Sequence, residues 1–141
     1  MEKDLDPHRD DVYRWEDSWP GWGKNHISFR DCKKLVFYAC DAYGVDRPEM
    51  ELHGPRSFSW SMPTDDRLSI QGGAHAGRGG RNVATVMHEA AHHIAWHLYG
   101  DRIQDHGRTF LRIYLDLLVR ARVAPEVALY ATAKSFGLKW R

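Results

Sequence analysis

Apolar residues recur at helical spacing in four segments of the chain. This pattern predicts helices over residues 28–43, 82–99, 107–122 and about 125–135. Residues that favour helix ends stand at the expected positions: Ser28 and Asn82 before a first turn, Gly44 and Gly100 after a last turn, and Pro125 in a first turn. The second half of the chain is therefore expected to be mainly helical.

Short segments with alternating apolar and polar residues lie between the first two predicted helices. Residues 57–62 and 67–71 alternate in this way and are joined by a Pro-Thr-Asp-Asp turn, which predicts a β-hairpin. Residues 49–53 predict a further strand. The glycine-rich segment 72–81 leads into the next helix, and we expect it to act as a mobile lid.

The first part of the chain has a weaker pattern. Residues 1–10 are polar and are expected to be loose. Tyr13, Trp15 and Trp19 follow closely on one another, which predicts a short strand or an irregular segment packed on the core. Together the elements predict one domain over residues 1–141 with an α+β fold: a small, mostly antiparallel sheet of three or four strands packed on two or three helices.

Composition limits the classes of protein that the chain can represent. The 141 residues carry a formal net charge of +1, which gives no general affinity for nucleic acid or membranes. Cys32 and Cys40 lie eight positions apart on a predicted helix, roughly 12 Å and too far for a disulfide. Free thiols, with no signal peptide and no long apolar run, predict a cytoplasmic protein.

Positive charge is concentrated in the last forty residues. Two interpretations are open: solvated helix faces, which we favour, and a surface that binds a polyanion such as nucleic acid. The basic residues of this region are Arg102, Arg108, Arg112, Arg120, Arg122, Lys134, Lys139 and Arg141.

The segment with the most specific chemistry is His88-Glu89-Ala90-Ala91-His92, an H-E-x-x-H motif within a predicted helix. Residues four apart share a helix face and lie about 6 Å apart along the axis. His88 and His92 can therefore bind one ion, and Glu89 stands beside them to take a proton from metal-bound water. The motif by itself also occurs by accident in ordinary amphipathic helices.

A catalytic zinc ion usually has three protein ligands and a water molecule. His106 opens the next predicted helix, and the turn before that helix is short, so the helix can double back and bring His106 to the same ion. The sequence thus predicts Zn²⁺ bound by His88, His92 and His106. If His106 is not a ligand, Asp101, Asp105 or Asp116 takes its place, although Asp116 has the i,i+4 spacing of an exposed ion pair with Arg112 and Arg120.

Residues 82–114 resemble the zinc segment of zincin metallopeptidases of the SprT/Spartan type, in which H-E-x-x-H is followed at a similar distance by H-G-x-x-F. The chain is more similar still to a group of small metallohydrolases of actinobacteria and their phages. These share a DVYRWEDSW-like start, the H-G-x-x-F-x-x-x-Y segment and a helical tail ending in Gly-Leu. The resemblance implies a zincin-like fold. The C-x-x-C pairs of the zinc ribbon found in many SprT proteins are absent from this sequence.

The preferred function is a zinc-dependent peptidase that acts on a polypeptide substrate, with Glu89 as general base. Tyr114 and His75 are candidates for stabilising the oxyanion. The strand 67–71 is expected to be the exposed sheet edge along which the substrate lies.

Two other functions remain open: a zinc-stabilised module that binds nucleic acid or a protein, and a zinc hydrolase of a non-peptide amide. His93 and His97 point away from His92 on a helix and are not expected to share its ion.

Overall fold

The computed structural model describes residues 8–19, 26–53, 59–62, 66–71, 81–100 and 106–141. These residues form five helices and three strands. Their bounds are α1 (Arg9–Asp17), α2 (Phe29–Tyr43), β1 (Glu49–His53), β2 (Trp60–Met62), β3 (Arg67–Gln71), α3 (Val83–Tyr99), α4 (Arg108–Arg120) and α5 (Glu126–Ser135). The predicted α+β class is confirmed.

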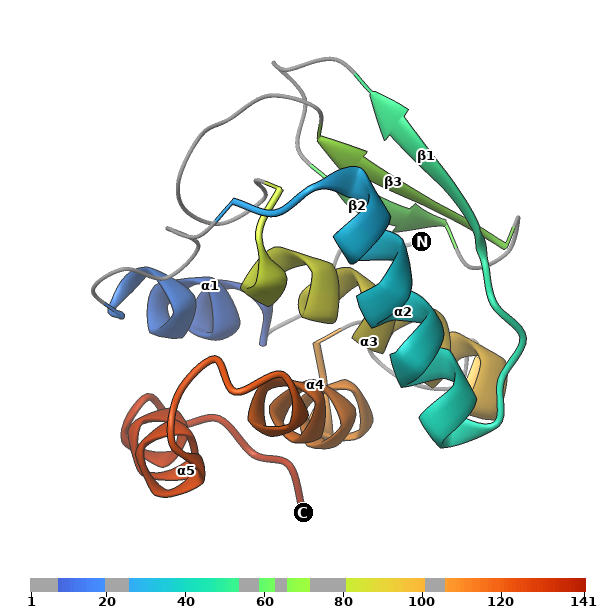
Figure 1. Ribbon diagram of the computed structural model, residues 1–141. Helices are drawn as coiled ribbons and strands as arrows, with labels where there is room; N and C mark the ends of the chain where they lie inside the picture. The colour runs from blue at the N-terminus through green and yellow to red at the C-terminus, as the bar shows by residue number, and fades with distance from the viewer. Residues whose placement is uncertain (1–7, 20–25, 54–58, 63–65, 72–80, 101–105) are drawn as a thin grey trace.

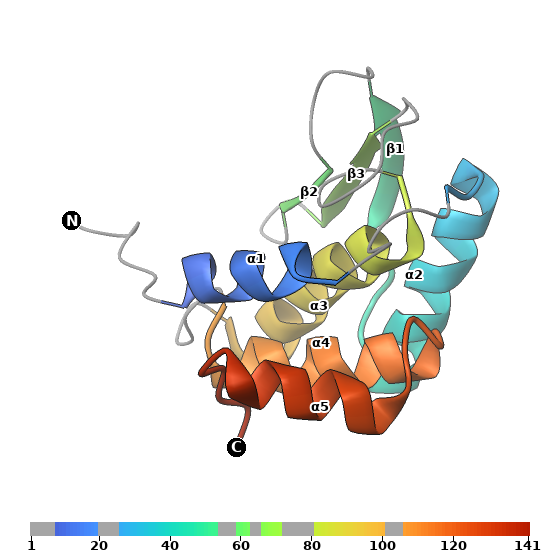
Figure 2. The same ribbon diagram turned by 90° about the vertical axis from the view of Figure 1, so that its left-hand side faces the viewer.

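Helix α3 lies at the centre of the arrangement (Figures 1 and 2). The sheet packs on one side of it and α4 on the other, while α2 lies beside α3 and α5 packs on α4. Ten residues of α3 are buried, so this helix is surrounded by protein along most of its length. Most side chains of α3 before its last turn are therefore held against a neighbouring element.

The sheet is mixed, so the prediction of a mostly antiparallel sheet is wrong. Its strand order is β1-β3-β2. The predicted hairpin is confirmed, because β2 pairs with β3 antiparallel, but β1 pairs with β3 in parallel. Alternation along a strand identifies which side chains share a face, and it does not identify the neighbouring strands.

The central position of β3 also makes the predicted substrate edge at residues 67–71 wrong. Leu68, Ser69 and Ile70 are all fully buried. Consecutive buried residues are typical of a strand that is covered on both faces, whereas an edge strand with one wet face alternates. The lid predicted over residues 72–81 lies almost wholly outside the described residues.

Residues 9–17 form a helix, and the predicted strand or irregular segment around Tyr13 and Trp15 is wrong. Val12, Trp15 and Glu16 follow the i, i+3, i+4 rule and are all buried. The Trp15 indole N–H donates to Thr132 Oγ1 at 3.0 Å, which ties α1 to α5. Of the ten residues predicted to be loose, Arg9 and Asp10 are helical, and residues 1–7 lie outside the described part.

The other helices begin and end as the sequence predicts. Ser28 Oγ accepts from the Asp31 N–H at 3.1 Å, and Asn82 Oδ1 accepts from the Thr85 N–H at 2.9 Å. Gly44 ends α2 with a φ of 68°, a conformation that glycine adopts without strain. Cys32 and Cys40 are buried free thiols. Among the described residues, no helix is both long and apolar enough to cross a membrane.

Candidate metal centre

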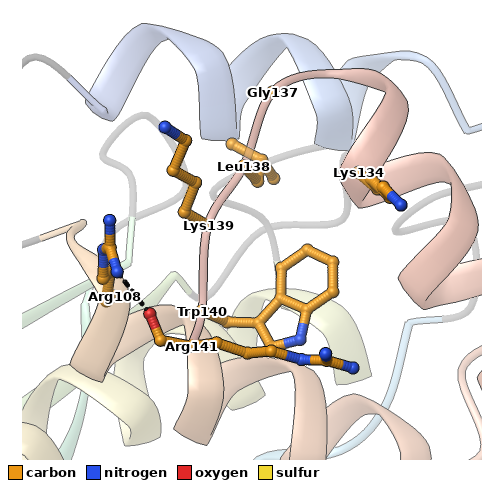
Figure 3. A pocket seen from close by; sticks show the side chains of 7 residues that line it. All are labelled: Arg108, Lys134, Gly137, Leu138, Lys139, Trp140 and Arg141. Carbon is orange, nitrogen blue, oxygen red and sulfur yellow. Dashed lines mark hydrogen bonds between the residues drawn. The ribbon is translucent and has the colours of Figure 1, made fainter.

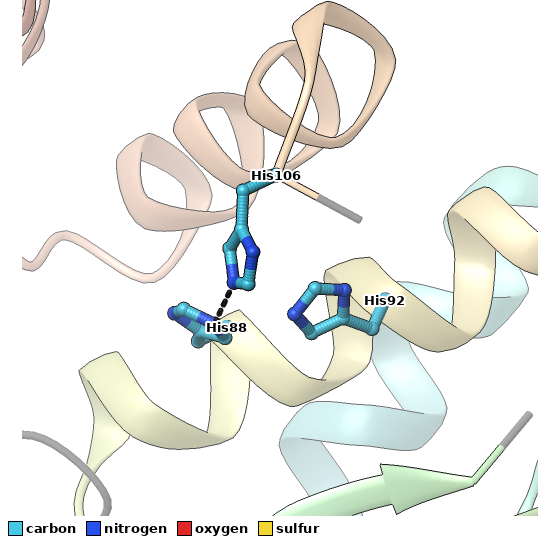
Figure 4. Close-up of side chains that lie close together, drawn as sticks. All are labelled: His88, His92 and His106. Atoms are coloured by element: carbon cyan, nitrogen blue, oxygen red, sulfur yellow. Dashed lines mark hydrogen bonds between the residues drawn. The ribbon is translucent and has the colours of Figure 1, made fainter. Parts of the chain in front are cut away.

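Three histidines converge between α3 and the start of α4 (Figure 4). His88 and His92 project from one face of α3, because they are one helical turn apart, and His106 reaches them from the residue that precedes the cap of α4. One ring nitrogen from each histidine lies within 4.8 Å of the corresponding nitrogens of the other two. His88 is 6% exposed and His106 is 5% exposed.

The spacing of one pair of these nitrogens matches that of two ligands on one metal ion. His88 Nε2 and His106 Nε2 are 3.3 Å apart. Two imidazole nitrogens at about 2.0–2.1 Å from a tetrahedral ion are separated by roughly 3.3 Å. His88 and His106 therefore already stand at the separation that a shared ion requires, and the His92 nitrogen lies within 4.8 Å of both.

The charge state of His92 also suits a ligand. Burial, together with the neighbouring His88 and His106, holds the pKa of His92 well below its ordinary value of 6.5. The ring is thus neutral at neutral pH and offers a lone pair. Its position is fixed by Phe110, which stacks on it with ring centroids 4.3 Å apart and an angle of 20° between the planes.

Glu16 belongs to the candidate site and was missed by the sequence analysis. Its Oε2 accepts a hydrogen bond from His88 Nδ1 at 2.6 Å and another from the Tyr114 hydroxyl at 2.6 Å. Because an ionised carboxylate only accepts, Nδ1 of His88 carries the proton and Nε2 carries the lone pair. A metal-binding histidine is commonly held in this way by a carboxylate at its other nitrogen.

The signal for Glu16 was present in the sequence, although it was weak. Glu16 follows Val12 and Trp15 at helical spacing, so a helix over these residues places a carboxylate in an otherwise apolar stripe. A carboxylate in such a stripe needs a buried partner. Its partner, His88, is 72 positions away, and no local pattern connects the two.

Glu89 follows the first histidine on α3 and faces β2. Burial raises the pKa of its carboxyl to about 7, and the charge of Glu16 adds to this rise. His88 and a backbone hydrogen bond at Ser61 act in the opposite direction. Glu89 is thus a partly buried carboxyl next to His88, held against the backbone of an edge strand.

The other residues singled out from the sequence lie elsewhere or have other partners. The Tyr114 hydroxyl donates to Glu16, and the side chain is fully buried, so the structure gives it a positioning contact. Asp116 accepts from Arg120 Nε at 2.8 Å and from the Tyr43 hydroxyl at 2.5 Å, away from the histidines. His75, Asp101 and Asp105 lie outside the described residues.

Four of the basic residues near the end of the chain line a separate hollow of about 400 Å³ (Figure 3). Arg108, Lys134, Lys139 and Arg141 line it together with Trp140, and Arg108 Nη1 donates to the Arg141 carbonyl oxygen at 2.6 Å. None of the three clustered histidines lines this hollow. This basic hollow and the histidine cluster are therefore at different places in the described structure.

Comparison with known proteins gives no relative: no protein-family model, curated protein or solved structure matches the chain.

Proposed function

We propose that the protein is a zinc-dependent peptidase whose zinc ion is bound by His88, His92 and His106. The observation that carries the proposal is the convergence of His88, His92 and His106, two of them buried and His92 partly buried, beside the carboxyl of Glu89, which belongs to the same H-E-x-x-H motif. Three neutral nitrogen ligands with one open position are typical of catalytic zinc, whereas structural zinc sites usually close with four protein ligands. The resemblance of residues 82–114 to SprT-type zincins supports the same assignment.

Bound zinc would supply a Lewis acid that polarises a carbonyl group and lowers the pKa of a water molecule. The residues of the chain would supply the proton transfer and the positioning of the zinc ligands. Glu89 accepts the proton of the attacking water and later donates it to the leaving amine. Glu16 keeps the Nε2 lone pair of His88 directed at the ion, and Tyr114 keeps Glu16 in place.

The position of Glu89 also suggests where a polypeptide would bind. In the described sheet β2 is an edge strand, and its backbone at Ser61 hydrogen-bonds to Glu89. An extended peptide commonly binds by adding to such an edge through main-chain hydrogen bonds. We therefore place the substrate at β2 instead of at β3, which has a strand on each side.

The direct test is Glu89→Gln, which keeps the shape of the side chain and removes the basic carboxylate. The zinc-loaded variant should retain one zinc at the three histidines and melt near the wild-type temperature. It should hydrolyse unfolded polypeptides about 10²- to 10⁴-fold more slowly, which is the usual worth of general acid–base catalysis. Glu126→Gln, on the exposed surface of α5, is the matched control and should keep full activity.

The assay is run with and without DNA, because the basic residues leave a nucleic-acid partner as an alternative. Equal hydrolysis by wild type and Glu89→Gln would refute the mechanism. No hydrolysis by either protein, combined with binding of DNA or a protein in a zinc-dependent manner, would favour the zinc-stabilised binding module. Hydrolysis of simple amides but not of polypeptides would favour the non-peptide hydrolase.

A further inference from the structure

A second cluster of metal-binding side chains lies on another face of α3. His93 and His97 are one helical turn apart, and Asp66 approaches them from the turn that precedes β3. One nitrogen of each histidine and one carboxylate oxygen lie within 4.8 Å of one another. The two rings are 4.3 Å apart between centroids, and His97 Nε2 is 2.6 Å from Asp66 Oδ1.

His93 provides an observation that a simple surface ion pair does not explain. Its side chain is fully buried, and Nε2 donates to the carbonyl oxygen of Asp46 at 2.8 Å. Because a carbonyl oxygen only accepts, Nε2 carries the proton and Nδ1 carries the lone pair. Nδ1 is buried and has no hydrogen-bond partner among the described residues. Burying an unsatisfied acceptor is unfavourable, and a bound cation would satisfy it.

The backbone holds Asp66 in place for such a role. Asp66 has a φ of 53°, in the left-handed region that aspartate tolerates better than most residues. Its carbonyl oxygen accepts from the Glu49 N–H at 2.6 Å, which joins the turn to the start of β1. The Asp66 carboxylate is therefore held near the end of α3, because Asp66 directly precedes β3 and its backbone is hydrogen-bonded to the start of β1.

We propose that His93 Nδ1, His97 Nε2 and Asp66 Oδ1 bind a second divalent transition-metal ion, distinct from the one at His88, His92 and His106. Two imidazoles and one carboxylate suit Zn²⁺ and related first-row ions, and they are a poor set for Ca²⁺ or Mg²⁺. With the ion bound, His97 Nε2 and Asp66 Oδ1 separate from 2.6 Å to roughly 3.3 Å, the spacing of two ligands on a tetrahedral ion.

This ion would link the start of β3 to α3, because Asp66 directly precedes β3 and both histidines lie on α3. The site is more open than the first, because the Asp66 side chain is 58% exposed and that of His97 is 23% exposed. We therefore expect this site to bind zinc more weakly than the site at His88, His92 and His106. The proposal does not rest on the peptidase function, since the two sites use different residues.

The experiment titrates the full chain with Zn²⁺ and with Co²⁺ after removal of metal by a chelator, and counts the bound equivalents. Wild type should bind two, one tightly and one weakly. Asp66→Asn and His97→Ala should each weaken the second equivalent by more than about 10-fold and leave the first unchanged. His26→Gln, which removes an exposed histidine outside both clusters, should keep both equivalents.

The complementary variant is His92→Ala, which should lose the tight equivalent and retain the weak one. Circular dichroism of each variant shows whether it folds, and Asp66→Asn keeps the assay meaningful if His97→Ala unfolds, because asparagine tolerates the left-handed backbone. A wild-type protein that binds a single equivalent up to millimolar zinc would overturn the proposal. So would a folded Asp66→Asn or His97→Ala variant with both affinities intact; Asp66 and His97 would then be an ion pair alone.

Discussion

The two histidine pairs of α3 have the same spacing in sequence and different surroundings in space. His88 and His92 form one pair, and His93 and His97 form the other. In each pair one ring is anchored at its second nitrogen by an acceptor from a distant segment: Glu16 holds His88, and the Asp46 carbonyl holds His93. Both pairs therefore present lone pairs in fixed directions, as metal ligands require.

The two clusters differ in the third residue that joins each histidine pair. His106 is buried and arrives with α4, whereas Asp66 is exposed and arrives on a turn. The buried cluster also has Glu89 beside it, and no second carboxyl is grouped with His93 and His97 among the described residues. The i,i+4 spacing thus accounts for both histidine pairs, while the greater burial and the neighbouring Glu89 distinguish the pair to which we assign the proposed catalytic zinc.

The largest expected effect comes from removing the third ligand of the buried cluster. His106→Ala should weaken the tight zinc equivalent by at least about 100-fold, because a direct ligand matters more than the groups that orient it. The weak equivalent at His93 and His97 should not change. Equilibrium dialysis with zinc analysis measures both. An unchanged tight affinity would exclude His106, and Asp101 or Asp105 would become the candidates, since Asp116 is paired with Arg120 and Tyr43.

Glu16→Gln should have a smaller effect on the same cluster. The amide no longer provides a charged acceptor for His88 Nδ1, so the tight affinity should fall about 10- to 100-fold. Tyr114→Phe is the graded control, since it removes one hydrogen bond to Glu16 and leaves the carboxylate. If Glu16 were only a packing residue, Glu16→Gln would lower the melting temperature and leave the zinc affinity of the folded protein unchanged.

Lowering the pH should destabilise the metal-free protein through one histidine of each pair, His92 and His93. The pKa values of His92 and His93 are lowered, mainly by burial. The unfolded state therefore binds more protons below the ordinary histidine pKa of 6.5, and stability falls as pH decreases through that value. The slope is at most about 1.4 kcal/mol per pH unit for each histidine. Urea unfolding of the chelator-treated protein measures it.

The control for this slope is His92→Gln, which should remove the contribution of one histidine and leave that of the other. A free energy of unfolding that is flat between neutral pH and pH 5 would contradict the assignment of these two rings as neutral in the folded protein.

Local sequence features predicted the helices and the histidines at the centre of the site. Asn82 and Ser28 cap helices as expected, and the spacing of His88 and His92 follows from the helix alone. His106 was predicted because it opens the helix that follows, and a short turn restricts where that helix can go. These inferences need only neighbouring residues or adjacent elements.

Contacts between distant segments were not predictable in the same way. The order β1-β3-β2 depends on which strands pair, and the alternation within residues 67–71 was equally compatible with an edge strand. Helix α1 has only one short apolar stripe, which is a weak signal in the sequence. The role of its carboxylate, Glu16, follows from the contact with His88 in the folded structure. Asp66 likewise reaches His97 across a turn, so the second cluster is a property of the tertiary structure.

The central claim is that His88, His92 and His106 hold one zinc ion beside Glu89. Crystals of the zinc-loaded protein, measured on both sides of the zinc absorption edge, test it most directly. The account predicts an anomalous peak with about 2.0–2.1 Å to one nitrogen of each histidine and an open position facing Glu89. Zinc bound elsewhere, with no peak between these three rings, would contradict it.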